Sequence, residues 1–211
     1  MTQDGRLIRG QRTRSAVLEQ ALLLATVSGL DGLSLSQVAD ALGVSKSGLF
    51  AHWRSKEALQ LAVIDQARAQ WTERVIRPAL SAPAGVRRLW AVHDSRIAFY
   101  EAKVLPGGCF FANAHFEFNA RPGPIRDRLA TEQTDWMTFL TGLATDAVTA
   151  GDLRADVSPA VLAYQVEALG ICAVMQAPVL GPGTTYPHAR RALLDHLRAI
   201  TCDPTILPEL T

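Results

Sequence analysis

Residues 33–59 read LSLSQVADALGVSKSGLFAHWRSKEAL, and this stretch carries several helix-start and helix-stop signals in close succession. Ser34, with a glutamine three residues later, fits a capping box, in which the two side chains satisfy each other's free backbone donors. Gly43 suits the left-handed conformation that ends a helix. Ser45 and Ser55 can each cap a further helix. Caps spaced this closely predict short helices that meet at sharp angles.

The caps predict helices over residues 35–42 and 46–53, followed at once by a longer helix that begins at residue 56. Apolar residues at helical spacing give the first of these helices one buried face. Two short helices joined by a tight turn form a helix-turn-helix, which can present its second helix to the major groove of DNA. The stretch therefore indicates a DNA-binding regulator rather than an enzyme.

The second short helix has an apolar side, which must pack on its neighbours, and a polar side left for solvent or DNA. Lys46 stands in the first turn, where recognition helices usually meet the groove, and Gly48 lets backbone approach the duplex closely. Arginines outnumber acids before Leu18, and this arm either binds phosphates or is a solubilising terminus. The predicted DNA contacts are Arg12, Arg14, Ser34, Gln37, Ser45, Lys46, Ser47, Gly48, Phe50, His52, Trp53 and Lys56.

With these residues the chain resembles the TetR/AcrR family of transcriptional regulators, over about Thr13 to Leu59. The resemblance rests on the order of the caps, the Gly-Val-Ser turn, the aromatic pair Phe50 and Trp53, and the Ser-Lys-Glu-x-Leu ending. It implies a dimer formed through the last two long helices and a small molecule held between the fourth helix and the long seventh helix. Phe50 stands where the family usually has a tyrosine whose hydroxyl meets a phosphate, and Phe50 lacks that hydroxyl.

Beyond residue 59 the chain reads as helices, without strand alternation. The predicted fold is all-α, with about nine helices. A three-helix helix-turn-helix DNA-binding domain covers residues 1–55, and a helical bundle for ligand binding and dimerisation covers residues 56–211. We expect helices over residues 14–28, 56–76, 86–103, 109–119, 124–150, 158–176 and 188–201, and a loop rich in proline and glycine over residues 178–187.

The composition of the chain constrains the class of protein less strongly than the helix-turn-helix does. The chain has 211 residues, a net charge of +1 and three cysteines without CxxC spacing, which indicates reduced thiols in a cytoplasmic protein. We expect no signal peptide, membrane span or cofactor. Motifs of zinc proteases, serine hydrolases and phosphate loops are absent. His115 and Glu117 are two residues apart, which on a helix points them to nearly opposite sides and excludes one metal site.

Two further groups of residues lie in the second half of the chain. Aromatic side chains of the middle helices either form core or line a ligand pocket. Apolar stripes on the last two helices face either the chain's own core or a second subunit, and the family resemblance favours the second subunit. The candidate ligand contacts are Trp71, Phe99, Tyr100, Cys109, Phe110, Asn113, His115, Phe116, Gln133, Trp136 and Phe139, and the candidate dimer contacts are Val166, Leu169, Gly170, Ala173, Ala177, Leu193, Leu194 and Leu197.

We therefore expect a homodimeric regulator that binds a palindromic double-stranded DNA operator, and favour a repressor that releases it when an unknown small molecule binds. One alternative is a helical small-molecule-binding protein whose DNA binding is weakened or lost, as the missing hydroxyl at Phe50 suggests. A second is a sensor of oxidants or electrophiles that acts through Cys109, because a thiol at a helix start favours thiolate. A buried, inert thiol is the other interpretation of Cys109.

Overall fold

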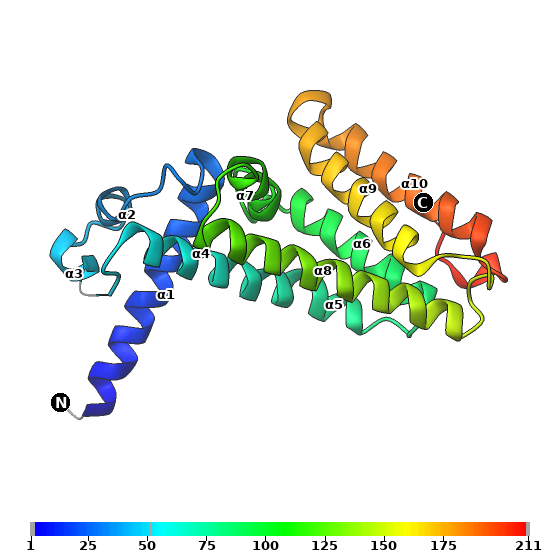
Figure 1. Cartoon of the computed structure of the whole chain (residues 1–211), viewed down its shortest axis with the longest axis horizontal. Helices are drawn as coiled ribbons and strands as arrows, with labels where there is room; N and C mark the ends of the chain where they lie inside the picture. The colour runs from blue at the N-terminus through cyan, green and yellow to red at the C-terminus, as the bar shows by residue number, and fades with distance from the viewer. Residues whose placement is uncertain (1–2, 51, 210–211) are drawn as a thin grey trace. The chain divides into compact units, whose positions relative to one another are not determined.

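A computed structural model describes the backbone of residues 3–50 and 52–209 and the side chains of residues 13–49 and 52–209. The expected all-α fold is confirmed: these residues form helices and no β-strand, only an isolated bridge between Leu153 and Thr201. The elements are α1 (Gln3–Ser28), α2 (Leu35–Leu42), α3 (Lys46–Phe50), α4 (Lys56–Trp71), η1 (Thr72–Ile76), α5 (Arg77–Leu80), α6 (Val86–Glu101), α7 (Phe110–Phe118), α8 (Pro124–Thr149), α9 (Pro159–Leu180), α10 (Pro182–Ile200) and η2 (Pro204–Ile206). Figure 1 labels the α-helices.

The chain folds into two compact units. The first unit comprises Met1–Gln70 and Leu105–Ala130, and the second comprises Trp71–Val104 and Thr131–Thr211. The helix-turn-helix therefore shares its unit with α4 and α7. The expected domain boundary lay after residue 55. The two units differ from that expectation because they are defined by contacts between helices that are far apart in the sequence.

Two N-terminal helices differ in length from the expectation. α1 begins at Gln3, so the backbone of the arginine-rich arm is helical. The side chain of Arg12 lies outside the described residues, and its phosphate contact stays a prediction, whereas Arg14 is exposed. α3 ends at Phe50 instead of residue 53.

The helix that begins at Lys56 does not stop before Pro78, and that prediction was wrong. α4 is followed directly by η1, a π-helical segment, and then by α5, which contains Pro78. The Arg77 N–H bonds the carbonyl oxygen of Thr72, five residues earlier. Proline lacks an N–H and its ring clashes with the carbonyl four residues earlier, so the wider π turn accommodates it without breaking the helix.

The predicted loop over residues 178–187 was also wrong. α9 continues to Leu180 and α10 starts at Pro182, with only Gly181 between them at a φ of 89°. Pro182 occupies the start of α10, where no N–H is needed, and Pro178 lies in the last turn of α9. Composition suggested a loop, but only Pro182 and Gly181 occupy positions that helix ends tolerate, while Pro178 and Pro187 lie inside α9 and α10.

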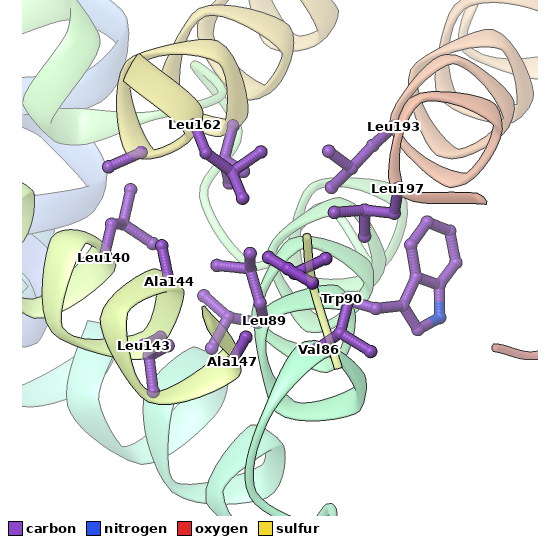
Figure 2. Packing of buried hydrophobic residues seen from close by; sticks show 14 of the residues in the cluster. Val86, Leu89, Trp90, Leu140, Leu143, Ala144, Ala147, Leu162, Leu193 and Leu197 are labelled. Carbon is purple, nitrogen blue, oxygen red and sulfur yellow. The ribbon is translucent and has the colours of Figure 1, made fainter. Parts of the chain in front are cut away.

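The core of the second unit is built by α6, α8, α9 and α10. Figure 2 shows Leu89, Leu140 and Leu162 packed together with Leu193 and Leu197. The residues predicted as dimer contacts face this chain's own interior, which corrects that assignment. Those that are buried are Val166, Gly170, Ala173, Ala177, Leu193, Leu194 and Leu197, and Leu169 is partly buried against the same core.

The opposite face of α9 is apolar and exposed. Tyr164 is 69% exposed and Val179 is 82% exposed, and both lie at helical spacing with Val161, Cys172 and Met175. We call these five residues the outer α9 face. By length and composition alone α9 could cross a membrane, and 39% of its apolar window is buried inside this fold. A helix that is apolar all round is normally covered on all sides, so this face lacks a covering within the described chain.

Candidate nucleic-acid interface and buried polar cluster

Three of the caps predicted for the helix-turn-helix are confirmed, those at Ser34, Gly43 and Ser55, while the Ser45 cap stays a prediction. The Gln37 N–H donates to the Ser34 hydroxyl at 3.2 Å, and the Ser34 N–H donates to the Gln37 side-chain oxygen at 2.9 Å. Gly43 adopts a φ of 63° and ends α2. The Ala58 N–H donates to the Ser55 hydroxyl at 3.0 Å at the start of α4. Gln37 therefore uses its side-chain oxygen to shape the unit, which leaves its amide nitrogen for any DNA contact.

The polar side of α3 is accessible, as expected. The side chain of Leu49 is buried, while Lys46 and its neighbours point to solvent. Lys46 lies 4.0 Å from Asp40, and such an exposed pair contributes little and is easily exchanged for a phosphate. Among the predicted DNA contacts in residues 45–52, the exposed ones are Ser45, Lys46, Ser47, Gly48 and His52. The side chain of Phe50 lies outside the described residues.

Trp53 is part of the core of the first unit and does not present a surface for DNA. Its side chain is only 2% exposed, and the Arg14 guanidinium lies 5.1 Å above its ring centre. The prediction of a direct DNA contact at Trp53 is therefore corrected. Its ring instead packs beneath the exposed Arg14 guanidinium in a cation–π contact.

Lys56 is engaged inside the first unit. Its ammonium donates to the carbonyl oxygen of Asp31 and to the Asp31 carboxylate, the latter at 3.2 Å. Arg121 bonds the same carboxylate at 2.7 Å. Hydrogen bonds from Lys56 and Arg121 hold the pKa of the Asp31 carboxyl below its ordinary value. Lys56 thus helps to fix the turn that follows α1, and because its side chain is still half-exposed its phosphate contact stays a prediction.

The candidate ligand residues are divided between the two units. In the first unit Cys109 and Phe110 are buried at the start of α7, which favours the inert thiol. Asn113 donates to the carbonyl oxygens of Thr26 and Gly107, so its amide has a structural role. His115 is half-buried and Phe116 is 59% exposed. The candidates in the second unit are Trp71, Phe99, Tyr100, Gln133, Trp136 and Phe139.

The aromatic residues of the second unit surround a buried arginine that the sequence analysis did not identify. Arg96 is 2% exposed and donates to the Tyr100 hydroxyl at 2.8 Å and to the Glu167 carboxylate at 2.7 Å. Its guanidinium lies within 6.0 Å of the ring centres of Trp71, Tyr100 and Trp136. The spacing of Arg96 and Tyr100, four residues apart on one helix face, was the signal available in the sequence.

Glu167 remains ionised inside this cluster. Burial alone would raise the pKa of Glu167, but the charge of Arg96 and hydrogen bonds from Trp136, Arg96 and Gln133 outweigh it and lower that pKa. Trp136 donates to the carboxylate at 2.7 Å. Gly170 makes room for the pair, since a Cβ there would lie 2.3 Å from a guanidinium nitrogen of Arg96. The cluster is thus a closely fitted ion pair within aromatic walls.

His93 of α6 is fully buried and contacts α10. Its Nε2 atom lies 3.1 Å from the carbonyl oxygen of Ala189, so the neutral ring carries its proton on Nε2. Its Nδ1 atom has no hydrogen-bond partner among the described residues. Burial, helped by the charges of Arg96 and Arg190, lowers the pKa of His93 to about 3.

We expect His93 to make the protein less stable in mild acid. Its folded pKa is about 3 and its ordinary value is 6.5, so below pH 6.5 the unfolded chain binds a proton that the folded chain does not. Stability should fall by about 1.4 kcal/mol per pH unit from this residue alone. Urea unfolding of wild type and His93→Gln, repeated at several pH values below 6.5, measures how steeply the free energy of unfolding falls with pH in each protein. Identical slopes for the two proteins would show that His93 does not control this loss.

Two protein-family models match parts of the chain. "Bacterial regulatory proteins, tetR family" matches residues 17–63, which include the capped helix-turn-helix. "Tetracyclin repressor-like, C-terminal domain" matches residues 85–193, from the start of α6 into α10. The two matches together cover the helix-turn-helix and most of the second unit.

Individual relatives give the same assignment. The HTH-type transcriptional regulator RutR of Escherichia coli (strain K12) is 38% identical over 77 residues, a match that spans only 34% of this chain and 36% of RutR. A TetR transcriptional regulator from Chloroflexus aurantiacus J-10-FL is 30% identical, with a TM-score of 0.84 over 92% of this chain and 98% of that one. AibR, solved with isovaleryl coenzyme A and operator DNA, shares the fold at 22% identity and a TM-score of 0.66, over 84% of this chain and 96% of AibR.

Proposed function

The chain belongs to the TetR family of bacterial regulatory proteins, and from this premise we propose that it is a cytoplasmic repressor that releases a palindromic operator when a small molecule binds. The observation that carries the proposal is the capped helix-turn-helix with the exposed polar side of α3. Lys46 and Arg14 supply accessible positive charge beside it, as phosphate binding requires. Nothing in the sequence motifs favours an enzyme.

We propose that two copies of the chain associate through the outer α9 face. Its exposed apolar side chains support this, because burying them against a second copy removes that surface from water. A two-fold dimer presents two α3 helices to successive major grooves and so reads a palindrome.

We propose that the effector binds in the second unit, near the aromatic residues around Arg96. Trp71 packs on Phe99 at 5.6 Å and on Trp136 at 5.5 Å between ring centres, and such rings suit the walls of a small-molecule site. The ligand reported for AibR supports a small-molecule effector in this fold. The effector must bind the DNA-free state more tightly than the DNA-bound state, since otherwise it shifts no equilibrium.

A gel shift tests the repressor directly. The probe is DNA from upstream of the protein's own gene, at two salt concentrations, with an unrelated duplex of equal length as control. We expect binding to the upstream DNA that is sequence-selective and weakens as salt rises. Equal binding to both duplexes at both salt concentrations would contradict the proposal.

A second candidate function is a small-molecule-binding protein with weakened DNA binding. The observations that favour it are Phe50, which lacks a hydroxyl, and Lys56, which is engaged with Asp31. Small-molecule binding with no selective binding to any duplex would favour this candidate over the repressor.

Replacing Lys46 with alanine should weaken operator binding about tenfold, because Lys46 stands in the first turn of the exposed helix. If Lys46 binds only phosphate, all duplexes lose affinity alike and the salt slope falls by about one. Fluorescence anisotropy at several salt concentrations measures both quantities. Lys103→Asn, which removes the same charge in the second unit, is the control. Unchanged affinity in Lys46→Ala would remove Lys46 from the interface.

A further inference from the structure

We propose that Glu117 of α7 is a positioning residue for operator binding, and that it acts by fixing the turn between α1 and α2. The proposal rests on the proposed DNA-binding function. The Glu117 carboxylate accepts the Leu30 N–H at 2.8 Å with one oxygen and the Asp31 N–H at 2.9 Å with the other. Hydrogen bonds to an ionised acceptor are stronger than neutral ones, so this two-point contact holds the turn firmly.

The turn is shaped to receive this carboxylate. Gly29 adopts a φ of +83°, and a Cβ at Gly29 would lie 2.8 Å from a carboxylate oxygen of Glu117. Only glycine permits both the left-handed backbone and the close approach. Leu30 is buried, and its carbonyl oxygen accepts from the buried Gln60 side chain of α4 at 2.8 Å. The backbone of this turn is thus held from α7 on one side and from α4 on the other.

Further bonds join α7 and its flanking residues to the same end of α1. Asn113 donates to the carbonyl oxygen of Thr26 at 3.2 Å, and the Gly107 N–H donates to the Thr26 hydroxyl at 3.2 Å. Arg121, just after α7, bonds the Asp31 carboxylate. Because α2 starts a few residues after this turn, its orientation, and with it that of α3, depends on these bonds.

The position of α7 in the chain gives the contact a regulatory meaning. The segment Leu105–Ala130 belongs to the first unit, but the chain enters it after α6, which lies in the second unit, and leaves it through α8, which continues into the second unit. Glu117 is therefore one of the groups through which a shift of this segment would reach the helix-turn-helix. The carboxylate itself is negative and contributes no phosphate contact.

The first test compares full-length wild type and Glu117→Gln on the operator selected by the wild type. Glutamine keeps the size but offers one acceptor oxygen and places an amide NH2 against a backbone N–H. We expect about a tenfold loss of operator affinity, the effect of one charge-assisted bond, with an unchanged salt slope because no phosphate contact is lost. Lys46→Ala, in contrast, should lower the slope. A role confined to stability would lower Tm and leave the affinity of the folded protein unchanged.

The second test follows the turn without DNA. In Glu117→Gln we expect the amides of Leu30 and Asp31 to exchange hydrogen about tenfold faster, because each loses its charged acceptor. Gly29→Ala should produce the same two effects by pushing the carboxylate away, and the double variant should lose less than the sum of the two. Glu73→Gln, at a surface glutamate that pairs with Arg77, is the matched control and should change neither quantity.

The outcomes separate this inference from the proposed function. Wild type that selects no DNA overturns the proposed function, and with it the role of Glu117 in DNA reading. Selective binding by wild type with equal affinity in Glu117→Gln overturns the inference alone. Faster amide exchange together with a loss of affinity at constant salt slope supports it.

Discussion

Glu167→Leu is expected to destabilise the protein by about 3–5 kcal/mol, because it removes the carboxylate that pairs at 2.7 Å with the buried charge of Arg96. The cost follows from the geometry of the cluster. The guanidinium is almost fully enclosed, with Glu167 as its partner at 2.7 Å and aromatic rings around it. The Trp136 N–H also loses its acceptor. Thermal and urea unfolding, with circular dichroism to confirm that the helices are retained, measure the loss.

The double variant Arg96→Met/Glu167→Leu is the decisive control. Replacing a whole buried ion pair by apolar residues of similar size is often neutral, so we expect the double variant to recover most of the stability. A double variant as unstable as Glu167→Leu would show that the pair's charges are not the source of the loss.

Met175→Asp on the outer α9 face is expected to convert the protein from dimer to monomer. Met175 is 52% exposed on an apolar face, so the aspartate costs nothing in the isolated chain but would be buried without a partner at the interface. Operator affinity should then fall by about 100-fold or more, because each half-site must be bound separately. Sedimentation velocity measures the oligomeric state and anisotropy measures the affinity.

Thr145→Asp, on the exposed side of α8, is the matched control for Met175→Asp and should leave the dimer intact. Tyr164→Asp provides a second, independent disruption of the same face. Wild type that sediments as a monomer, or a Met175→Asp protein that remains dimeric, would reject the outer α9 face as the interface.

The sequence identified the helix-turn-helix because its signals act over a few residues. Ser34 and Gln37 bond each other directly, and Gly43 ends α2 through its own backbone conformation. Local effects of this kind can be predicted from a few neighbouring residues in the sequence. They also fixed the starts of α3, α4 and α8 at the expected residues.

The errors arose where the outcome depends on distant contacts. α9 is apolar all round, so its spacing could not show which face is buried, and the prediction chose the inward face for dimer contacts. Pro182 is typical of a loop, and the sequence around it does not show that it begins α10. Arg96 and Glu167 are 71 positions apart, and the amides that bind Glu117 are 86 and 87 positions away from it. No local pattern marks such partners.

Selection from a random pool of duplex DNA by the purified full-length protein tests the central claim most directly. We expect enrichment of a palindrome whose half-sites lie about 10 base pairs apart, or a multiple of that spacing, and whose binding weakens steeply with salt. Lys46→Ala should bind the enriched duplex more weakly than wild type. A pool that shows no enriched sequence after repeated rounds, from protein that is folded and dimeric, would contradict the assignment of this chain as an operator-binding regulator.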